Sequence, residues 1–352
     1  MFLTQNLERL SLILGSSVTG FLIAFILAPW FTRLLIKFKI GKQIRENAIS
    51  GEKAELFNAL HAKKSGTPTM GGLLIWGTVL VVIVISRIAS GFGLFDRSLL
   101  NRKETWIPIF TMVTCGILGA IDDYLNIKGV GKTKGISAKL KTFWLIVFSA
   151  AGGWWFYEKL GFTSISVPIS GVSSIELGWW YIPLFIFVIN ATANSVNFTD
   201  GLDGLASGLL IMSFGAFGII AFVKGMFILA ALCGVICGTI SAFLWFNVPP
   251  AKFYMGDTGS LALGATLGVI AMLTDQALTL PLIGFIYVIE TLSVIIQLFS
   301  KKFFKRKVFK IAPIHHHFEQ SGWAEFTVVM RFWTIGGIMT SMGVVLALST
   351  LK

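Results

Sequence analysis

The sequence predicts an all-α polytopic membrane protein, and three observations support this fold class. Hydrophobic residues make up 55% of the 352 positions and charged residues only 13%, and the mean hydropathy is +0.80. A soluble globular protein could not cover that much apolar surface. The chain also has ten apolar segments that could cross a bilayer core of about 30 Å, and its basic residues gather in alternate loops. We expect a single integral-membrane domain over residues 1–352.

The ten expected transmembrane helices follow one another along the chain. They cover residues 16–36, 71–85, 107–121, 142–156, 179–196, 205–223, 225–246, 260–273, 278–299 and 327–351. The third and the eighth are short for a bilayer, so their helices must include polar residues at one end. Both run directly into aspartates, which is the first sign of a site. The first segment lacks a basic start and a small-residue cleavage site, so we interpret it as a retained span.

The distribution of Lys and Arg predicts which loops face the cytoplasm. With both termini on the exterior face, 21 of the 29 basic residues fall on the cytoplasmic side. They lie at residues 33–64, 128–141, 252 and 301–331. Because basic residues favour cytoplasmic loops, we choose this orientation. It makes residues 41–69 and 301–325 the two long cytoplasmic loops.

The net charge of +12 is explained mostly by membrane topology and anionic headgroups. An anionic substrate that carries phosphate is a more specific explanation. Basic and aromatic residues do not alternate as in nucleic-acid-binding proteins, so we expect no nucleic-acid partner. The three cysteines lie in apolar segments, and the spacing of Cys233 and Cys237 is typical of helix packing rather than of a disulfide or a metal site.

The stretch NFTDGLDGLA joins the fifth and sixth expected helices on the cytoplasmic side. Capping of the sixth helix by Thr199 or Asp203 would explain one acidic residue. It would not explain four polar residues spaced three apart along the chain. These are Asn194, Asn197, Asp200 and Asp203. Because ionisable groups near membrane depth are often functional, the stretch favours a site.

Two adjacent carboxylates, Asp122 and Asp123, end the third expected helix, and Asn126 follows one turn later. Neighbouring carboxylates repel, so the pair needs a cation nearby. Three lysines of the next loop could supply it as a solvated charged face. They are Lys128, Lys132 and Lys134. A divalent metal, or a diphosphate held by lysines, is the alternative.

A third motif, FNVPPAKFYMGDTGSLALG, connects the seventh and eighth expected helices. Asn247 closes one helix and Asp257 precedes the next. The small residues around Asp257 make a helix start whose free N–H groups suit a phosphate. The simpler alternative is that Asp257 is only an N-cap. Tyr254 is an unexplained aromatic residue in this loop unless a flat group stacks on it.

Histidine is scarce, and all four residues lie in the two long cytoplasmic loops, at His61 and in the triplet His315 to His317. Three consecutive histidines cannot all face one metal from a regular helix, and no cysteine is near, so we do not expect a zinc site. A run of surface histidines is the simple alternative. Five motifs nevertheless meet on one membrane face, and together they indicate a metal-assisted reaction of a phosphate compound.

These motifs resemble those of the polyprenyl-phosphate N-acetylhexosamine 1-phosphate transferases. The markers are GTPTMGG at 66–72, DDYLN at 122–126, NFTDGLDGLA at 197–206, FNVPPAKFYMGDTGSLALG at 246–264 and PIHHHFE at 313–319. The resemblance covers essentially the whole chain. TPTMGG and HHHFE point to the branch that handles the muramoyl-pentapeptide.

The resemblance implies a fold and an activity. Members have ten transmembrane helices, usually in a homodimer, around a cytoplasmic cleft in the bacterial inner membrane. With Mg²⁺, this branch transfers phospho-MurNAc-pentapeptide from UDP-MurNAc-pentapeptide to undecaprenyl phosphate. The products are lipid I, an intermediate of peptidoglycan synthesis, and UMP.

The resemblance also implies roles for individual residues. Asp257 resembles the Mg²⁺ ligand, Asp122 and Asp123 the catalytic pair, and His315 the first histidine of the triplet. Seven residues match positions on the substrate side of the cleft. They are Lys64, Thr69, Asn197, Asp200, Asp203, Asn247 and Tyr254. Tyr254 stands where the family commonly has phenylalanine for stacking on uracil.

Three alternatives stay open from the sequence. An aspartate could attack first and give a covalent intermediate, or Asp122 could act as a base for direct attack by the lipid phosphate, which we favour. The donor could be UDP-GlcNAc, as in a related branch. An ion-coupled transporter would also contain carboxylates, but near the midplane in broken helices rather than at helix ends.

Overall fold

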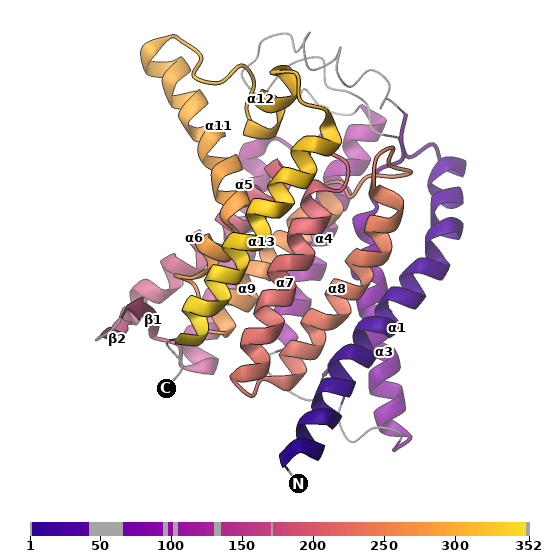
Figure 1. Cartoon of the computed structure of the whole chain (residues 1–352), viewed down its shortest axis with the longest axis vertical. Coiled ribbons are helices and arrows are strands. Elements are labelled where there is room, and N and C mark those ends of the chain that lie inside the picture. Colours follow the sequence, from indigo (N-terminus) through magenta and orange to yellow (C-terminus); the bar gives the residue numbers. More distant parts are fainter. Residues whose placement is uncertain are drawn as a thin grey trace.

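The computed structural model describes residues 2–41, 66–93, 98–100, 105–129, 135–169 and 172–349. These residues form a bundle of long helices with one small β-hairpin (Figure 1). The long helices are α1 (Phe2–Lys37), α3 (Gly72–Gly91), α4 (Trp106–Lys128), α5 (Ala138–Leu160), α6 (Tyr181–Thr199), α7 (Leu205–Val223), α8 (Phe227–Asn247), α9 (Asp257–Leu273), α11 (Phe285–Phe304) and α13 (Glu325–Ser349). The short elements are η3 (Gly178–Trp180), α10 (Leu280–Ile283), α12 (Ile314–Gln320) and the strands β1 (Ser164–Ile169) and β2 (Val172–Glu176).

The helical, multi-pass character expected from the sequence is confirmed. Each of the ten apolar segments lies in a helical region, although the ninth is broken at Gly284 into α10 and α11. Within the described residues, seven helices are long and apolar enough to cross a membrane, and α9 is apolar but shorter. That all ten helices cross the bilayer stays a prediction. The antiparallel β1–β2 hairpin is a small addition to the expected all-α fold.

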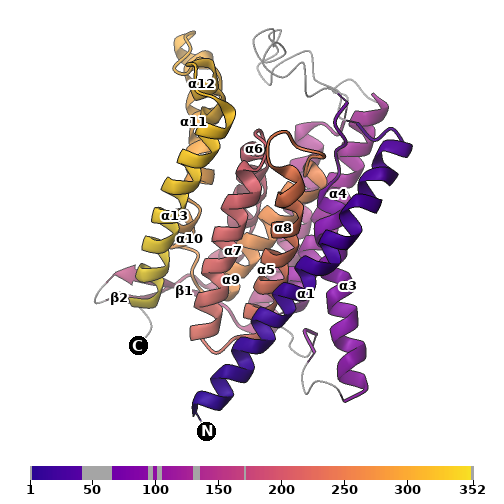
Figure 2. The ribbon, with the colours of Figure 1, turned by 45° about the vertical axis from the view of Figure 1, so that its right-hand side comes forward.

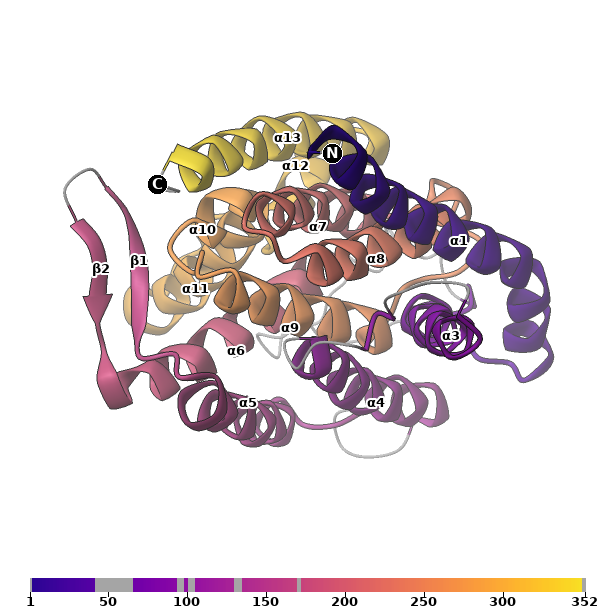
Figure 3. The same ribbon diagram turned by 90° about the horizontal axis from the view of Figure 1, so that it is seen from below.

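Helix α9 forms the centre of the bundle (Figure 3). Every residue from Thr258 to Leu273 is buried. Glycines let two neighbouring helices approach it closely, because a Cβ on Gly72 of α3 would overlap the backbone of Gly259, and a Cβ on Gly119 of α4 would overlap the carbonyl of Asp257. Small residues at such contacts are typical of helix packing in membranes. The starts of α3 and α9 therefore meet beside the last turns of α4.

Helices α11, α12 and α13 diverge from the rest of the bundle (Figure 2). The short helix α12 lies at one end of the molecule, while α1 begins and α13 finishes toward the opposite end (Figure 1). That both termini lie on the exterior face of the membrane stays a prediction.

Candidate active site

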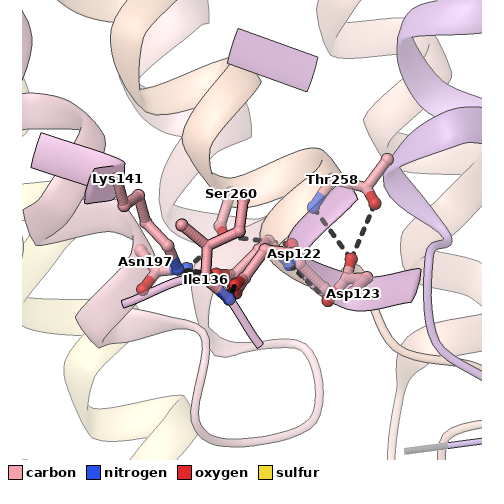
Figure 4. Close-up of polar contacts among 9 residues, drawn as sticks. Asp122, Asp123, Ile136, Lys141, Asn197, Thr258 and Ser260 are labelled. Atoms are coloured by element: carbon pink, nitrogen blue, oxygen red, sulfur yellow. Dashed lines mark hydrogen bonds and ion pairs between the residues drawn. The ribbon is translucent and has the colours of Figure 1, made fainter. Parts of the chain in front are cut away.

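Asp257 is the first residue of α9, and its carboxylate receives the side chains of Asn197 and Lys141, which lie near Asp122 in Figure 4. Oδ1 accepts a hydrogen bond from Asn197 Nδ2 at 2.8 Å. Oδ2 forms an ion pair with Lys141 Nζ. The N-cap position belongs to Gly256, which has a positive φ of 71°. Asp257 is thus not the N-cap that the simpler alternative required.

Lys141 joins two of the predicted aspartates. Its Nζ also lies 2.8 Å from Asp122 Oδ2, and Asp122 Oδ1 accepts the backbone N–H of Ile136 at 2.6 Å. Burial by itself lowers the pKa of Lys141, which precedes the apolar part of α5, but the carboxylates of Asp257 and Asp122 outweigh that effect and raise the pKa above its ordinary value. An ammonium group therefore balances two carboxylates in one small cluster.

Sequence reasoning missed Lys141 as a specific partner of the aspartates. It expected Lys128, Lys132 and Lys134, of which the last two lie outside the described residues. Lys141 was counted only among the basic residues of the loop. A signal was available, because Lys141 lies one turn after Ser137, whose side chain accepts a hydrogen bond from Leu140 N–H and caps α5. That cap places Lys141 in the first turn of a helix.

Asp123 has different partners from those of Asp122. Its carboxylate accepts the backbone N–H of Asp257 at 3.2 Å, the N–H of Thr258 at 2.9 Å and the Thr258 hydroxyl at 2.6 Å. It therefore caps the start of α9 from another helix. This corrects one expectation, because the N–H groups predicted to suit a phosphate are already bonded to Asp123. Helix α4 also continues to Lys128, so the two aspartates lie inside it rather than at its end.

Thr69 and Gly256 lie against the Asp123 carboxylate. A Cβ on Gly256 would overlap Asp123 Oδ2 and lie 2.8 Å from Thr69 Oγ1. Thr69 is buried, and its hydroxyl has no hydrogen-bond partner among the described residues. The GTPTMGG segment is thus part of the same cluster. Lys64, the other predicted residue of this region, lies outside the described residues.

Asn247 is built into the framework of the site. It is 3% exposed, and its Oδ1 accepts hydrogen bonds from the Gly204 N–H and the Ser207 hydroxyl, both at 3.1 Å. Its Nδ2 donates to the carbonyl of Phe253 at 3.1 Å. The predicted contact of Asn247 with the substrate is therefore not supported. The side chain instead joins the start of α7 to the loop before α9.

The turn between α6 and α7 is held from both sides. Asp203 Oδ2 accepts the N–H of Ala251 at 3.0 Å, and the Asp203 N–H donates to Glu325 Oε1 at 2.9 Å. The N-cap of α7 is Gly204, and no side chain caps it, so the capping alternative for Asp203 or Thr199 is wrong. Asn197 faces Asp257 while Asp203 faces the loop before α9, so these residues do not share one face.

Asp200 and Tyr254 are partly buried. The backbone of Tyr254 pairs with the GTPTMGG segment, since its N–H donates to the Pro68 carbonyl at 2.8 Å and its carbonyl accepts the Gly71 N–H at 2.7 Å. This pairing holds the Tyr254 loop beside the start of α3. Stacking of the Tyr254 ring and the role of Asp200 in binding stay predictions.

His315 is fully buried, and its Nδ1 lies 2.9 Å from Glu290 Oε2. The His315 ring is therefore enclosed by the protein and does not lie over an open cleft. His316 Nδ1 lies 2.7 Å from Glu319 Oε2, and His317 Nδ1 accepts the backbone N–H of Lys310 at 3.2 Å. Three separate partners orient the three rings differently. Within the described ranges, no group of three or more His, Cys, Asp or Glu residues could hold a metal by itself.

The architecture and the polar cluster together place the protein in a class: multi-pass helical membrane proteins with acidic, amide and lysine side chains gathered at helix ends. The family description "Glycosyl transferase family 4" matches residues 105–275, which run from the start of α4 through α9. A signature of phospho-N-acetylmuramoyl-pentapeptide transferases matches residues 64–75, which include Thr69 and Gly72.

Curated relatives match nearly the whole chain. The phospho-N-acetylmuramoyl-pentapeptide transferase of Halalkalibacterium halodurans is 39% identical over 97% of this chain and 98% of its own length. The corresponding transferase of Bacillus pumilus is 37% identical over 94% of this chain and 97% of its own length. That of Chloroflexus aurantiacus is 38% identical over 98% of this chain and 91% of its own length. The chain belongs to the phospho-N-acetylmuramoyl-pentapeptide transferase family, which confirms the resemblance found in the motifs.

Proposed function

We propose that this protein transfers phospho-MurNAc-pentapeptide from UDP-MurNAc-pentapeptide to undecaprenyl phosphate, giving lipid I and UMP. Family membership supports the type of transfer. The cluster in which Lys141 joins Asp122 and Asp257 is the observation that carries the assignment to this site. Both reactants are phosphate anions, so such a site must reduce repulsion between them before they can react.

The donor set suits Mg²⁺. Asp122 and Asp257 offer carboxylate oxygens, which are hard ligands that Mg²⁺ prefers, and both already lie around one cation, the Lys141 ammonium. A group of three acidic side chains is not needed, because Mg²⁺ commonly binds one or two carboxylates together with substrate phosphates. Asp257 would hold the ion, and the ion would supply charge neutralisation at the diphosphate.

The chain's own residues provide the remaining steps. Asp122, held by Lys141 and the Ile136 N–H, takes the proton of the lipid phosphate, and a phosphate oxygen then attacks the phosphorus attached to the sugar. A new P–O bond forms while the bond to UMP breaks, and UMP leaves. Asn197 keeps the Asp257 carboxylate in place, and Lys141 balances the negative charge that gathers between Asp122 and Asp257.

The proposal includes the setting of the reaction. The site faces the cytoplasm of a bacterial inner membrane, since basic residues concentrate on that side of the chain. The protein works as a homodimer, as the family resemblance implies. The lipid acceptor enters from the bilayer, and the nucleotide donor enters from water.

The experiment that tests the proposal is UMP release by the purified protein with undecaprenyl phosphate and each UDP-sugar in turn. We expect rapid release with UDP-MurNAc-pentapeptide and slow release with UDP-GlcNAc. Comparable rates with both donors would place the protein with the broader sugar-phosphate transferases. Release of no UMP from either donor, together with ion flux in proteoliposomes, would favour the transporter alternative.

A further inference from the structure

Glu290 is an acidic residue within a largely apolar helix that the proposed reaction does not use. It lies in α11 with no exposed surface, and among the described residues its Oε1 has no hydrogen-bond partner. Burying a carboxyl group completely is expensive, so its presence calls for a specific role. The other carboxylate oxygen, Oε2, lies 2.9 Å from His315 Nδ1. This contact with His315 is where a role for Glu290 must be sought.

The contact selects a proton position on the His315 ring. The carboxyl group accepts from Nδ1–H in this assignment, because the reverse arrangement, with a protonated carboxyl donating to Nδ1, would leave a buried N–H without a partner on Nε2. In a neutral ring, Nε2 then carries a lone pair. Nε2 has no hydrogen-bond partner in the described part of the chain. A buried acceptor without a partner is tolerated better than a buried N–H without one, which again favours hydrogen on Nδ1.

The other edge of the His315 ring lies against the turn between α6 and α7. A Cβ on Gly201 would overlap Nε2 and come within 2.8 Å of Cε1. Gly201 directly follows Asp200 and comes two residues before Asp203, which are both predicted to line the nucleoside part of the cleft. The ring thus supports the turn that carries these two carboxylates, and glycine is the residue that allows the contact.

We propose that Glu290 is a positioning residue for the transfer: it holds the His315 imidazole with hydrogen on Nδ1, so that the ring supports the Asp200–Asp203 turn with its lone-pair edge. This role rests on the proposed function, since it concerns how the nucleotide donor is bound. Loss of the carboxylate would release the ring or change its tautomer. The turn would then shift, and donor binding would weaken more than acceptor binding.

The tautomer of His315 can be measured by NMR without an enzyme assay. The chain has four histidines, so ¹⁵N-histidine labelling of the full-length protein in detergent gives few signals, and the His315→Gln variant identifies those of His315. We expect the wild-type ring to be neutral with hydrogen on Nδ1. We expect Glu290→Gln to move it toward hydrogen on Nε2. A wild-type ring that is doubly protonated or carries hydrogen on Nε2 overturns the proposal. This test uses the wild-type protein, so it remains valid even if the Glu290→Gln variant does not fold.

Kinetics provide the second arm. Glu290→Gln should raise KM for the UDP donor fivefold or more and leave KM for the lipid acceptor within twofold. Gly201→Ala should act in the same direction, because it presses on the ring, whereas Gly215→Ala, which meets no atom within 4 Å, should not. Equal changes in both KM values, or an unchanged donor KM with folded protein, overturn the proposal. If the wild-type protein releases no UMP, the proposed function fails while the tautomer result still stands.

Glu319 offers a matched control for the tautomer. It pairs with His316 at 2.7 Å, so both are Glu–His contacts at similar distance. Glu319→Gln should change the His316 signals and leave hydrogen on Nδ1 of His315. A loss of the His315 tautomer in this variant would mean that the loop as a whole, and not Glu290, sets the ring, which overturns the proposal.

Discussion

Adjacent residues of the same type can have different tasks, and the two aspartates of the DD motif illustrate this. Asp122 pairs with the Lys141 ammonium at 2.8 Å, whereas Asp123 accepts three hydrogen bonds from the first turn of α9. A helix start favours negative charge because its N–H groups lack partners within the helix. Asp123 therefore supports the position of Asp257, and Asp122 is the carboxylate that fits a reactive role.

The first prediction compares Asp122→Asn with Asp123→Asn. In Asp123→Asn, the side-chain NH₂ would face a backbone N–H of α9 where the carboxylate accepted a hydrogen bond. We therefore expect a loss of about 1–3 kcal/mol of stability. An amide at position 122 also meets donors, but the Lys141 ammonium keeps Asp257 as its partner, so we expect a smaller drop in Tm than for Asp123→Asn, while loss of the base should lower turnover at least a hundredfold. Thermal unfolding in detergent and UMP release measure the two effects. An equal drop in Tm for both variants would contradict this division of roles.

The second prediction concerns the ammonium group of Lys141. Lys141→Gln leaves two neighbouring carboxylates, Asp122 and Asp257, without their cation, so they should repel each other. We expect loss of turnover and a lower Tm without divalent metal. Added Mg²⁺ should raise the Tm of the variant more than that of the wild type, because the ion replaces the missing charge. The same Mg²⁺ response in both proteins would count against a cation site here.

The third prediction tests the aromatic side chain at position 254. Tyr254→Ala should weaken binding of the UDP donor by about 1–3 kcal/mol if the ring stacks on the base, and Tyr254→Phe should bind normally. Isothermal titration with the UDP donor measures both variants. An unchanged Kd for the Ala variant would remove the stacking role and leave only the backbone pairing with Pro68 and Gly71.

At the scale of helices, close packing of small residues holds the site together. Residues of α3 and α4 meet the start of α9 through Gly72 and Gly119. The polar cluster depends on these contacts, because Asp122 and Asp123 lie only one turn after Gly119 on α4. The last two glycines of the GTPTMGG motif, Gly71 and Gly72, therefore have a packing reason beside any contact with substrate.

The fourth prediction tests this packing with two glycines of one helix. Gly72→Ala should destabilise the protein by about 1–3 kcal/mol, because backbone atoms of Gly259 cannot move aside cheaply. Gly77→Ala, also in α3, meets no atom within 4 Å and should be neutral or slightly stabilising. Thermal unfolding of the two variants measures the difference. A Tm for the Gly72 variant equal to that of the Gly77 variant would show that the contact is looser than described.

At the scale of the whole molecule, the distribution of charge predicts the orientation in the membrane. The tip of α11 carries Lys301 and Lys302 in its last turn, while the β1–β2 hairpin connects α5 and η3 elsewhere on the molecule. The bias of basic residues predicts that the end of α11 lies on the cytoplasmic side and the hairpin on the exterior side. Figure 1 shows α11 reaching the end that carries α12 and the hairpin in the opposite half.

The fifth prediction follows from this orientation. A thiol reagent that cannot cross membranes should label Glu176→Cys in intact cells but should label Lys305→Cys only after the membrane is opened. Both positions are exposed, whereas Cys115 and Cys233 are buried and Cys237 is partly buried, so the background should be low. Labelling of Lys305→Cys in intact cells would reverse the topology and move the site to the exterior face.

Local features of the chain were enough to predict the membrane class, the apolar segments and the motifs that carry chemistry. Hydropathy and residue type are read within a short window, so these properties need no knowledge of distant contacts. The sequence also indicated that Asn197, Asp122 and Asp257 belong to one site, since topology places their helix ends on one face. The family resemblance in GTPTMGG and HHHFE was likewise visible in short segments.

Which side chains meet became known only from the packing of the helices. Lys141 and Asp257 are 116 positions apart, and Asp123 and Thr258 are 135 apart, so no local pattern could pair them. Burial of His315 against Glu290, the capping of α9 by Asp123 and the use of Asn247 as a framework residue depend on contacts between distant helices. A polar group's role depends on its partners, and distant segments supply those partners only when the helices pack together.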